Sequence, residues 1–312
     1  MVNFFDLHCD TLSKALDENK QLYENDLHIS LKRAQKYDNY IECFAAWIPD
    51  EIRGDAAMSH FNRLYQKLIS EQKNNTDVFS ICRDVNDIEN LVKSGNKTGA
   101  VLTVEGGAVL GGKLENVRYL REKGVRVMTL TWNGACEIGD GVEAPNAGGL
   151  SDFGKKAVKE MEKCGIIVDV SHASEKMFYD VYEISEKPFI ATHSNSKKVC
   201  NHRRNLTDEQ FRIIAKCGGI VGINFCNDFL SDNNSASFDD IIKHAEHFLE
   251  LGGENVISFG SDFDGCDVPV EIAGIECIEN LYEYFLKKNY NQNVVDKMFF
   301  GNAYKFMIDN LK

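Results

Sequence analysis

His8 and Asp10 stand two residues apart at the end of the first apolar run of the chain, in the stretch FFDLHCDTL (4–12). In an extended strand, residues two apart point to the same face. The two side chains therefore aim at one point in space, where they could ligate a metal ion. A polar pair at the frayed end of a strand is the plainer interpretation, and these two residues alone do not decide between the two.

Other polar side chains follow later apolar runs in the same way. They are Glu105, Trp132, Asn133, His172, His193, Asn224, Asp262 and Asp264. Each has a structural interpretation, since a lone aspartate after a strand often caps the next helix, and a lone histidine is more often a core or surface residue than a ligand. Whether the set can act together depends on the elements that position it.

Eight apolar runs have the length and composition of β-strands, and amphipathic segments lie between them. The expected strands span residues 4–8, 42–48, 100–105, 125–131, 165–171, 188–193, 219–225 and 256–262. The later runs are almost entirely apolar, as expected of parallel strands that are buried on both faces. The segments at 49–98 and 228–238 are expected to be insertions, the second of them a polar loop.

The alternation of strands and helices predicts an α/β fold, a (β/α)8 TIM barrel, as a single domain over residues 1–312. A doubly wound open sheet is the rival fold, but it usually carries a Gly-rich phosphate fingerprint after its first strand, and none follows here. Two helix starts are expected from their caps, one at Ser151 and one at Thr207, which stands at capping-box spacing from Gln210.

In a barrel of this type the active site is built at the C-terminal ends of the strands, so three histidines and three acidic residues are expected on one rim. Imidazole and carboxylate together suit zinc and similar divalent ions. There are too many ligands for one tetrahedral site, whereas two ions about 3.5–4 Å apart that share a carboxylate would use them all. Such a pair activates a bridging water and polarises a carbonyl oxygen, which suggests hydrolysis of an amide or ester.

The bulk composition narrows the classes of function. The chain of 312 residues is 43% hydrophobic, enough for a large core, and its formal net charge of −13 without a basic stripe disfavours a nucleic-acid partner. Ten cysteines occur without a CxxC pair, which favours buried free thiols. No signal peptide is visible and no apolar run is long enough to span a bilayer, so the sequence predicts a cytoplasmic protein with no membrane partner.

A series of short motifs resembles a known family. The motifs are DLHCD, VEGG, LTWN, GLSDFG followed by GIIVDVSH, ATHSN followed by NHRRNLTD, and GSDFDG. Their order and approximate spacing match from residue 6 to the C-terminal GNAYKF, which is nearly the whole chain. VEGG alone is weak, but VSHAS followed by THSN and NHRRN is specific. The chain thus resembles the membrane (renal) dipeptidase family, peptidase family M19, and within it the cytoplasmic microbial branch.

The resemblance implies a (β/α)8 barrel of the metal-dependent hydrolase type with a binuclear zinc site. By position, His8 and Asp10 would bind one ion, and His172 and His193 would bind the other. Glu105 would bridge both ions. The cofactors implied are therefore two divalent metal ions, most simply Zn²⁺, although ligand type alone does not distinguish zinc from manganese or cobalt.

The same resemblance assigns roles at the substrate. Asp262, the first acid of SDFDG, would be the catalytic general acid/base that takes a proton from the bridging water and passes it to the leaving amine. Arg204 would pair with the C-terminal carboxylate of the substrate. Trp132 stands where well-known members have a histidine that contacts the substrate carbonyl, so either Asn133 takes that role or no residue does, and Trp132 is expected to pack on a substrate side chain. Phe229 stands where the family can place a tyrosine near the substrate carboxylate.

The leading hypothesis is a zinc-dependent dipeptidase that hydrolyses the peptide bond of small dipeptides. An amidohydrolase that acts on another small amide, such as an N-acyl amino acid, is the alternative, and a barrel that binds metal or a ligand without turnover is a third. The expected partners are small dipeptide substrates, and a homodimer is left open as the assembly.

Overall fold

The computed structural model describes residues 2–95, 97–233 and 235–311. The strands are β1 (Asn3–Cys9), β2 (Asn39–Trp47), β3 (Phe79–Ile81), β4 (Thr98–Glu105), β5 (Val125–Thr129), β6 (Ile167–Asp169), β7 (Val221–Ile223) and β8 (Ile257–Phe259). The α-helices are α1 (Thr11–Asp17), α2 (Leu31–Ala34), α3 (Gly54–Asn74), α4 (Val85–Ser94), α5 (Glu115–Glu122), α6 (Asp152–Cys164), α7 (Glu175–Ile184), α8 (Asp208–Lys216), α9 (Asn227–Leu230), α10 (Phe238–Glu250), α11 (Ile278–Lys287), α12 (Gln292–Asp296) and α13 (Asn302–Asn310). The 3-10 helices are η1 (Gly107–Leu110), η2 (Gly253–Asn255) and η3 (Ile275–Cys277), and a π-helical turn, η4 (Lys297–Gly301), joins α12 to α13.

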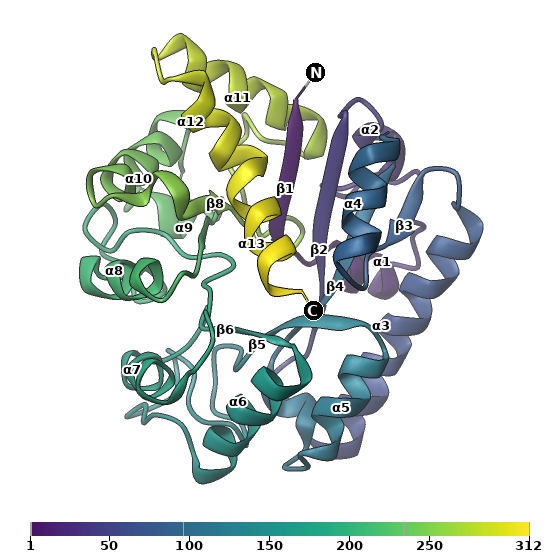
Figure 1. The fold of residues 1–312 in the computed structure, drawn as a ribbon, viewed down its shortest axis with the longest axis vertical. Coiled ribbons are helices and arrows are strands. Elements are labelled where there is room, and N and C mark those ends of the chain that lie inside the picture. The colour runs from purple at the N-terminus through teal and green to yellow at the C-terminus, as the bar shows by residue number, and fades with distance from the viewer. Residues whose placement is uncertain (1, 96, 234, 312) are drawn as a thin grey trace.

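The strands form one parallel sheet that curls into a barrel. Hydrogen-bonded neighbours run in the order β6-β5-β4-β2-β1-β8-β7, and each of these pairings is parallel. Isolated parallel bridges from Asp169 to Ile190 and from Ala191 to Val221 connect β6 with β7, so the two ends of the sheet meet. Helices surround the strands in Figure 1. The predicted α/β fold of the (β/α)8-barrel type is confirmed.

Two parts of the predicted strand pattern are wrong. Residues 188–193 form no regular strand, because they contribute only the single bridges that close the barrel. Conversely, β3 lies inside the segment 49–98 that was expected to be an insertion, and it pairs with the first half of β4. The strand has only three residues among many polar ones, so it left no periodic signal. In the segment 228–238, α9 ends at Leu230 and α10 begins at Phe238, and the described residues between them connect the two helices.

The two predicted helix starts are confirmed. The Ser151 hydroxyl accepts a hydrogen bond of 2.9 Å from the backbone N–H of Gly154, in the first turn of α6. Thr207 and Gln210 form a reciprocal capping box at the start of α8. These caps determine where α6 and α8 begin, and each of these helices follows a loop at the C-terminal ends of the strands.

The barrel interior is closed at one end by the C-terminal helix. Side chains from the first half of the strands, such as Phe5, Ile41 and Val101, form one buried cluster with Phe306 and Met307 of α13. In Figure 1 this helix crosses in front of β1. Because α13 packs beneath the beginnings of the strands, the polar side chains at their other ends remain free to line a site.

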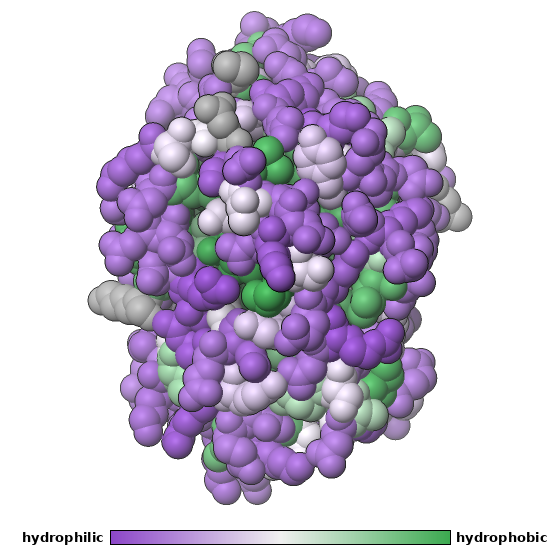
Figure 2. Space-filling view, turned by 90° about the vertical axis from the view of Figure 1, so that its right-hand side faces the viewer, coloured by the Kyte–Doolittle hydropathy of each residue, from purple (hydrophilic) through white to green (hydrophobic). Residues whose placement is uncertain are grey.

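The outer surface is largely hydrophilic, with small scattered apolar patches on the face that Figure 2 shows. Val270 is an exposed large apolar residue. Among the described residues, no helix combines the length and the apolar character needed to cross a bilayer.

Candidate active site

A β-bulge in the first strand directs His8 into the site. In the pairing of β1 with β2, Asp6 lies opposite Glu42 and Cys9 lies opposite Phe44, so three residue steps on β1 face two steps on β2. Such an extra residue re-aims the side chains that follow it. His8 is buried, and its Nε2 lies 3.3 Å from Oδ2 of the likewise buried Asp10. The two side chains therefore share one point in space, as their spacing predicted.

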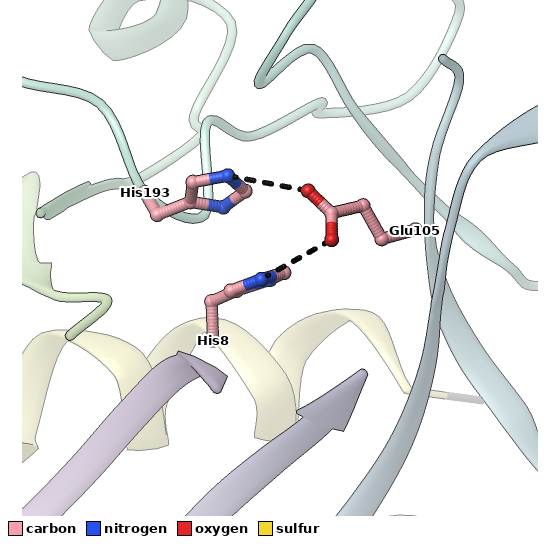
Figure 3. A group of neighbouring side chains, drawn as sticks. All are labelled: His8, Glu105 and His193. Carbon is pink, nitrogen blue, oxygen red and sulfur yellow. Dashed lines mark ion pairs between the residues drawn. The ribbon is translucent and has the colours of Figure 1, made fainter. Parts of the chain in front are cut away.

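Glu105 ends β4, and its two carboxylate oxygens have different histidine neighbours. Its Oε1 is 2.8 Å from Nε2 of His172 and 3.6 Å from Nε2 of His193. Its Oε2 faces the other way, 3.6 Å from Nε2 of His8. Figure 3 shows the carboxylate reaching from its strand to both imidazoles drawn there, those of His8 and His193. One carboxylate thus offers one oxygen to each side.

His172 lies in the loop after β6 and adopts a left-handed backbone conformation, with φ of +66°. Non-glycine residues rarely adopt this conformation, and such positions cluster at functional sites. Its Nδ1 is 2.8 Å from Oδ1 of Asn133, and its Nε2 is 2.9 Å from Nε2 of His193. Asn133, expected at the substrate, therefore contacts a candidate ligand directly.

His193 is placed by a close approach of three backbone segments. The carbonyl oxygen of Thr192, the residue before it, would lie 1.9 Å from a Cβ at Gly222 and 1.8 Å from a Cβ at Gly260. Any side chain at either glycine would push this segment outward. The Nδ1 of His193 is 2.8 Å from the Thr192 hydroxyl, so its Nε2 faces Glu105.

Asp262 follows β8 and also has a left-handed backbone, with φ of +61°. Its Oδ2 accepts a hydrogen bond of 2.8 Å from Nδ2 of Asn224. Its Oδ1 lies 4.0 Å from Nε2 of His8. One oxygen is thus held by an amide from the neighbouring strand, while the other faces the centre of the site.

Buried carboxylates set the electrostatics on the side of His8. Burial alone would disfavour the protonated imidazole, but Glu105, Asp10 and Asp262 outweigh it and raise the pKa of His8 to about 10. Burial, and next the charge of Asp10, raise the pKa of Glu105 well above its usual value. The protein therefore concentrates negative charge at a buried point, which a cation would neutralise.

The opposite trend holds on the side of His172 and His193. Burial, together with the nearby positive charges of Arg204 and His8, holds the pKa of both imidazoles well below the usual value. Neutral imidazoles with free Nε2 lone pairs are the form that binds a metal.

The donor set fits divalent metal ions. The ligand atoms of His8, Glu105 and His193 lie within 4.8 Å of one another, and so do those of His8, Asp10 and Asp262. Oδ1 of Asp10 is buried and has no hydrogen-bond partner among the described residues. Imidazole nitrogens and carboxylate oxygens at this spacing are the ligands of zinc and related ions.

A cavity of about 360 Å³ opens above these side chains. Trp132 lies in its wall, 5.0 Å from Trp47 between ring centroids in an edge-to-face arrangement. Arg204 is buried in the wall too, with its guanidinium 5.4 Å over the ring of Phe229. The volume suits a small ligand, and the wall combines aromatic surface with one buried cation.

The structure brings all nine predicted site residues to this region, and it adds others that the sequence did not single out. The added residues are Trp47, Asp169 and Thr192, which line the cavity or hold a candidate ligand. The only sequence signal for Asp169 is that it is the one charged residue in the apolar run GIIVDV.

Comparison with known proteins agrees with this geometry. The model of the membrane dipeptidase family (peptidase family M19) matches residues 1–310. An uncharacterised protein from the pqqA 5′ region of Klebsiella pneumoniae is 32% identical over 232 residues, 71% of this chain and 85% of that protein. The solved structure of a dipeptidase of family M19, a metallopeptidase, superposes with a TM-score of 0.93 at 26% identity over 99% of both chains.

A metallopeptidase from Rhodobacter sphaeroides, solved with a phosphinate mimic of the dipeptide L-Ala-D-Ala, has the same fold. Its TM-score is 0.92 at 24% identity, over 100% of this chain and 99% of that chain. The match of the family model over almost the entire chain settles the relationship, and the predicted enzyme class, a metal-dependent dipeptidase, is confirmed. The chain belongs to the membrane dipeptidase family, peptidase family M19.

Proposed function

We propose that the protein hydrolyses the peptide bond of small dipeptides and that it does so with two zinc ions. His8 and Asp10 would hold one ion, His172 and His193 the other, and Glu105 would bridge them through its two oxygens. The opposite orientation of Oε1 and Oε2 supports this division, since each oxygen lies within 3.6 Å of a different histidine group. When bound, the ions would supply an activated water and polarise the scissile carbonyl.

Asp262 is the proposed general acid/base. Its Oδ1 faces the centre of the site, while Asn224 holds Oδ2 at 2.8 Å. Oδ1 would accept the proton of the attacking water and then deliver it to the nitrogen of the leaving amine. This transfer lets the amine depart as a neutral group instead of an anion.

Arg204 is the proposed anchor for the C-terminal carboxylate of the dipeptide. It is a buried cation in the cavity wall, and its planar fork can hold a carboxylate with two hydrogen bonds. Trp132 and Trp47 would form an apolar wall for a substrate side chain. Because Asn133 bonds Nδ1 of His172, we propose that it orients this ligand in addition to lining the substrate cavity.

The observation that carries the proposal is that the two oxygens of Glu105 have different neighbours, with His8 at Oε2 and the pair His172 and His193 at Oε1. The test is metal analysis of the purified protein together with hydrolysis of L-Ala-L-Ala and L-Ala-D-Ala. Two equivalents of zinc and chelator-sensitive cleavage of at least one dipeptide are expected. Full activity of a metal-free protein, or intact dipeptides with a metal-loaded protein, would contradict it.

An amidohydrolase acting on N-acyl amino acids is the second candidate, because Trp132 replaces a polar family residue in the cavity wall. N-acetyl-L-alanine in the same assay separates the two, since it offers the carboxylate and the amide without a free amine. A single domain, a cytoplasmic location and a homodimer stay predictions.

A further inference from the structure

We propose that Asp169 is a positioning residue that sets the tautomer of His193, and thereby its capacity to bind metal, through the hydroxyl of Thr192. This inference rests on the proposed metal site. Asp169 ends β6, is fully buried and does not line the cavity. Its charge also acts on Arg204, so the Thr192 variants below, which keep that charge, isolate the effect that passes through hydrogen-bond direction.

The carboxylate of Asp169 is surrounded by hydrogen-bond donors. Oδ1 accepts from the backbone N–H groups of Ser171 and Thr192, both at 2.9 Å. Oδ2 accepts from the hydroxyls of Thr192, at 2.6 Å, and Thr129, at 2.5 Å. An ionised carboxylate can only accept, so the hydroxyl proton of Thr192 must point at Asp169.

The direction of that proton decides the next bond. With its proton committed to Asp169, the Thr192 oxygen can only accept from Nδ1 of His193, which lies 2.8 Å away. The Ser171 hydroxyl, 3.3 Å from the same oxygen, itself accepts from the backbone N–H of His193, so it is free to donate to Thr192. Nδ1 therefore carries the imidazole proton, and the lone pair lies on Nε2.

The Nε2 lone pair points at the proposed metal site, 2.9 Å from Nε2 of His172 and 3.6 Å from Oε1 of Glu105. A histidine that ligates through Nε2 must have its proton on Nδ1, and partners that hold that proton typically change metal affinity 10–100-fold when removed. The hydrogen-bonded chain Asp169–Thr192–His193 meets this requirement, and it starts from Asp169 at the end of β6.

Asp169→Asn would reverse the donor and acceptor roles in the hydrogen bonds that link residue 169, Thr192 and His193. The two backbone N–H groups at Oδ1 require an acceptor, so the amide oxygen must take that position and the NH2 group must take the position of Oδ2. The NH2 group donates to Thr192, whose proton then turns to Nδ1 of His193 and leaves the proton of the ring on Nε2. The substitution is nearly isosteric, so packing stays the same while the tautomer changes.

Thr129→Val is the matched control, because Thr129 gives Oδ2 the same kind of bond but does not touch His193. Thr192→Val removes the connection, and Thr192→Ser restores it with the same hydroxyl. This set keeps the inference testable if Asp169→Asn does not fold, which circular dichroism and thermal unfolding of the metal-free proteins would show.

The experiment measures bound zinc against a graded series of chelators for each variant, with the histidine tautomer read from long-range ¹H–¹⁵N spectra of metal-free protein. Asp169→Asn is expected to bind the weaker of its two ions about 10–100-fold less tightly, with Nε2–H at His193. Thr192→Val should weaken the same ion, and Thr192→Ser and Thr129→Val should match wild type.

The inference would be overturned if Asp169→Asn bound two zinc ions as tightly as wild type, or if it left the tautomer of His193 unchanged. If Asp169→Asn does not fold, wild-type zinc affinity in Thr192→Val would overturn it instead. A weakening in Thr129→Val equal to that in Asp169→Asn would do the same, because it would indicate a general loss of structure. Wild-type protein that binds fewer than two ions would instead contradict the proposed metal site itself, so the two failures are distinguishable.

Discussion

Asn224 donates a hydrogen bond of 2.8 Å to Oδ2 of Asp262, and it does so from a fully buried position. The amide is itself held, since its Oδ1 accepts from the backbone N–H of Cys226 at 2.6 Å. Its main chain exchanges two further bonds with the side chain of Asn195. A residue that directly follows β7 thus fixes the carboxylate of Asp262 in the segment after β8 and leaves its Oδ1 available for proton transfer.

Replacing Asp262 with asparagine tests that role. Asp262→Asn keeps the size of the side chain but removes the proton acceptor. We expect kcat to fall by about 10²–10⁴-fold with the metal content unchanged, the range usual for a general acid–base group. Steady-state kinetics and metal analysis of the same preparation check this.

Asp264→Asn is the matched control, because Asp264 lies two residues away in the same motif. Its carboxylate bonds the Thr11 hydroxyl and the backbone N–H of His28, so its loss should reduce stability more than turnover. Wild-type turnover by Asp262→Asn, or an equal loss of turnover in both variants, would exclude Asp262 as the proton carrier.

Arg204→Lys tests the carboxylate anchor. Lysine keeps the positive charge but loses the planar fork, so kcat/KM for free dipeptides should fall about 10–100-fold, mainly through KM. Dipeptides with a C-terminal amide should be nearly unaffected, because they offer no carboxylate. Arg203→Lys, at the exposed neighbouring position, should behave as wild type, and an equal loss with amidated substrates would remove Arg204 from this role.

Trp132→Ala tests the aromatic wall of the cavity. The edge-to-face contact with Trp47 holds the indole at the rim of the cavity. Burying a large apolar substrate side chain against it is worth about 1.5–3 kcal/mol, so KM for a phenylalanine-containing dipeptide should rise about 10–100-fold. KM for L-Ala-L-Ala should change far less, and Trp132→Phe should restore part of the difference. Equal changes for both dipeptides would place substrate side chains elsewhere.

The candidate ligands could be predicted from the sequence because they are histidines and acids that directly follow apolar runs. Parallel strands bring their C-terminal ends to one rim, so Glu105 and His172, distant in the chain, had to meet. Ser151 and Thr207 marked helix starts for an equally local reason, namely side chains that accept from the following turn.

Two features that the sequence did not indicate depend on the folded chain, namely the direction of the hydrogen bonds at Thr192 and the closure of the barrel near Ile190. Thr192 belongs to a common residue type, and its importance comes from a carboxylate on one side and an imidazole on the other, which only the folded chain brings together. The apolar run around Ile190 predicted a regular strand. In the structure this segment closes the barrel with isolated bridges only, so the regular strand does not form. The chain Asp169–Thr192–His193 is tertiary, and no spacing rule encodes it.

A histidine outside the site predicts how the fold responds to acid. His244 of α10 is fully buried, and its Nδ1 accepts a hydrogen bond of 3.0 Å from the backbone N–H of Ser196. Its Nε2 donates to the carbonyl oxygen of Leu230 at 3.1 Å, so the ring is bonded as a neutral imidazole. Burial lowers the pKa of His244 from 6.5 to about 4.

Because the unfolded chain protonates this histidine near pH 6.5 and the folded chain only near pH 4, the unfolded state binds more protons between these values. The free energy of unfolding should therefore fall as the pH drops from 6.5 to 4, with a contribution from His244 of about 3 kcal/mol. The raised pKa of Asp6, about 6 because of burial, acts in the opposite direction over part of this range. The wild-type slope is thus a sum of terms, and a variant is needed to isolate one of them.

His244→Asn keeps an acceptor for the N–H of Ser196 but removes the titrating ring. Urea unfolding of the metal-free protein at several pH values should give a slope against pH smaller than wild type by up to one proton between pH 4 and 6.5. His247→Asn, one turn along the same helix and partly exposed, controls for the loss of a histidine at this helix. If His244→Asn kept the wild-type slope, the acid response would have to come from the other histidines whose pKa values burial lowers, which are His60, His172, His193 and His202. Bound metal would suppress the part that comes from His172 and His193.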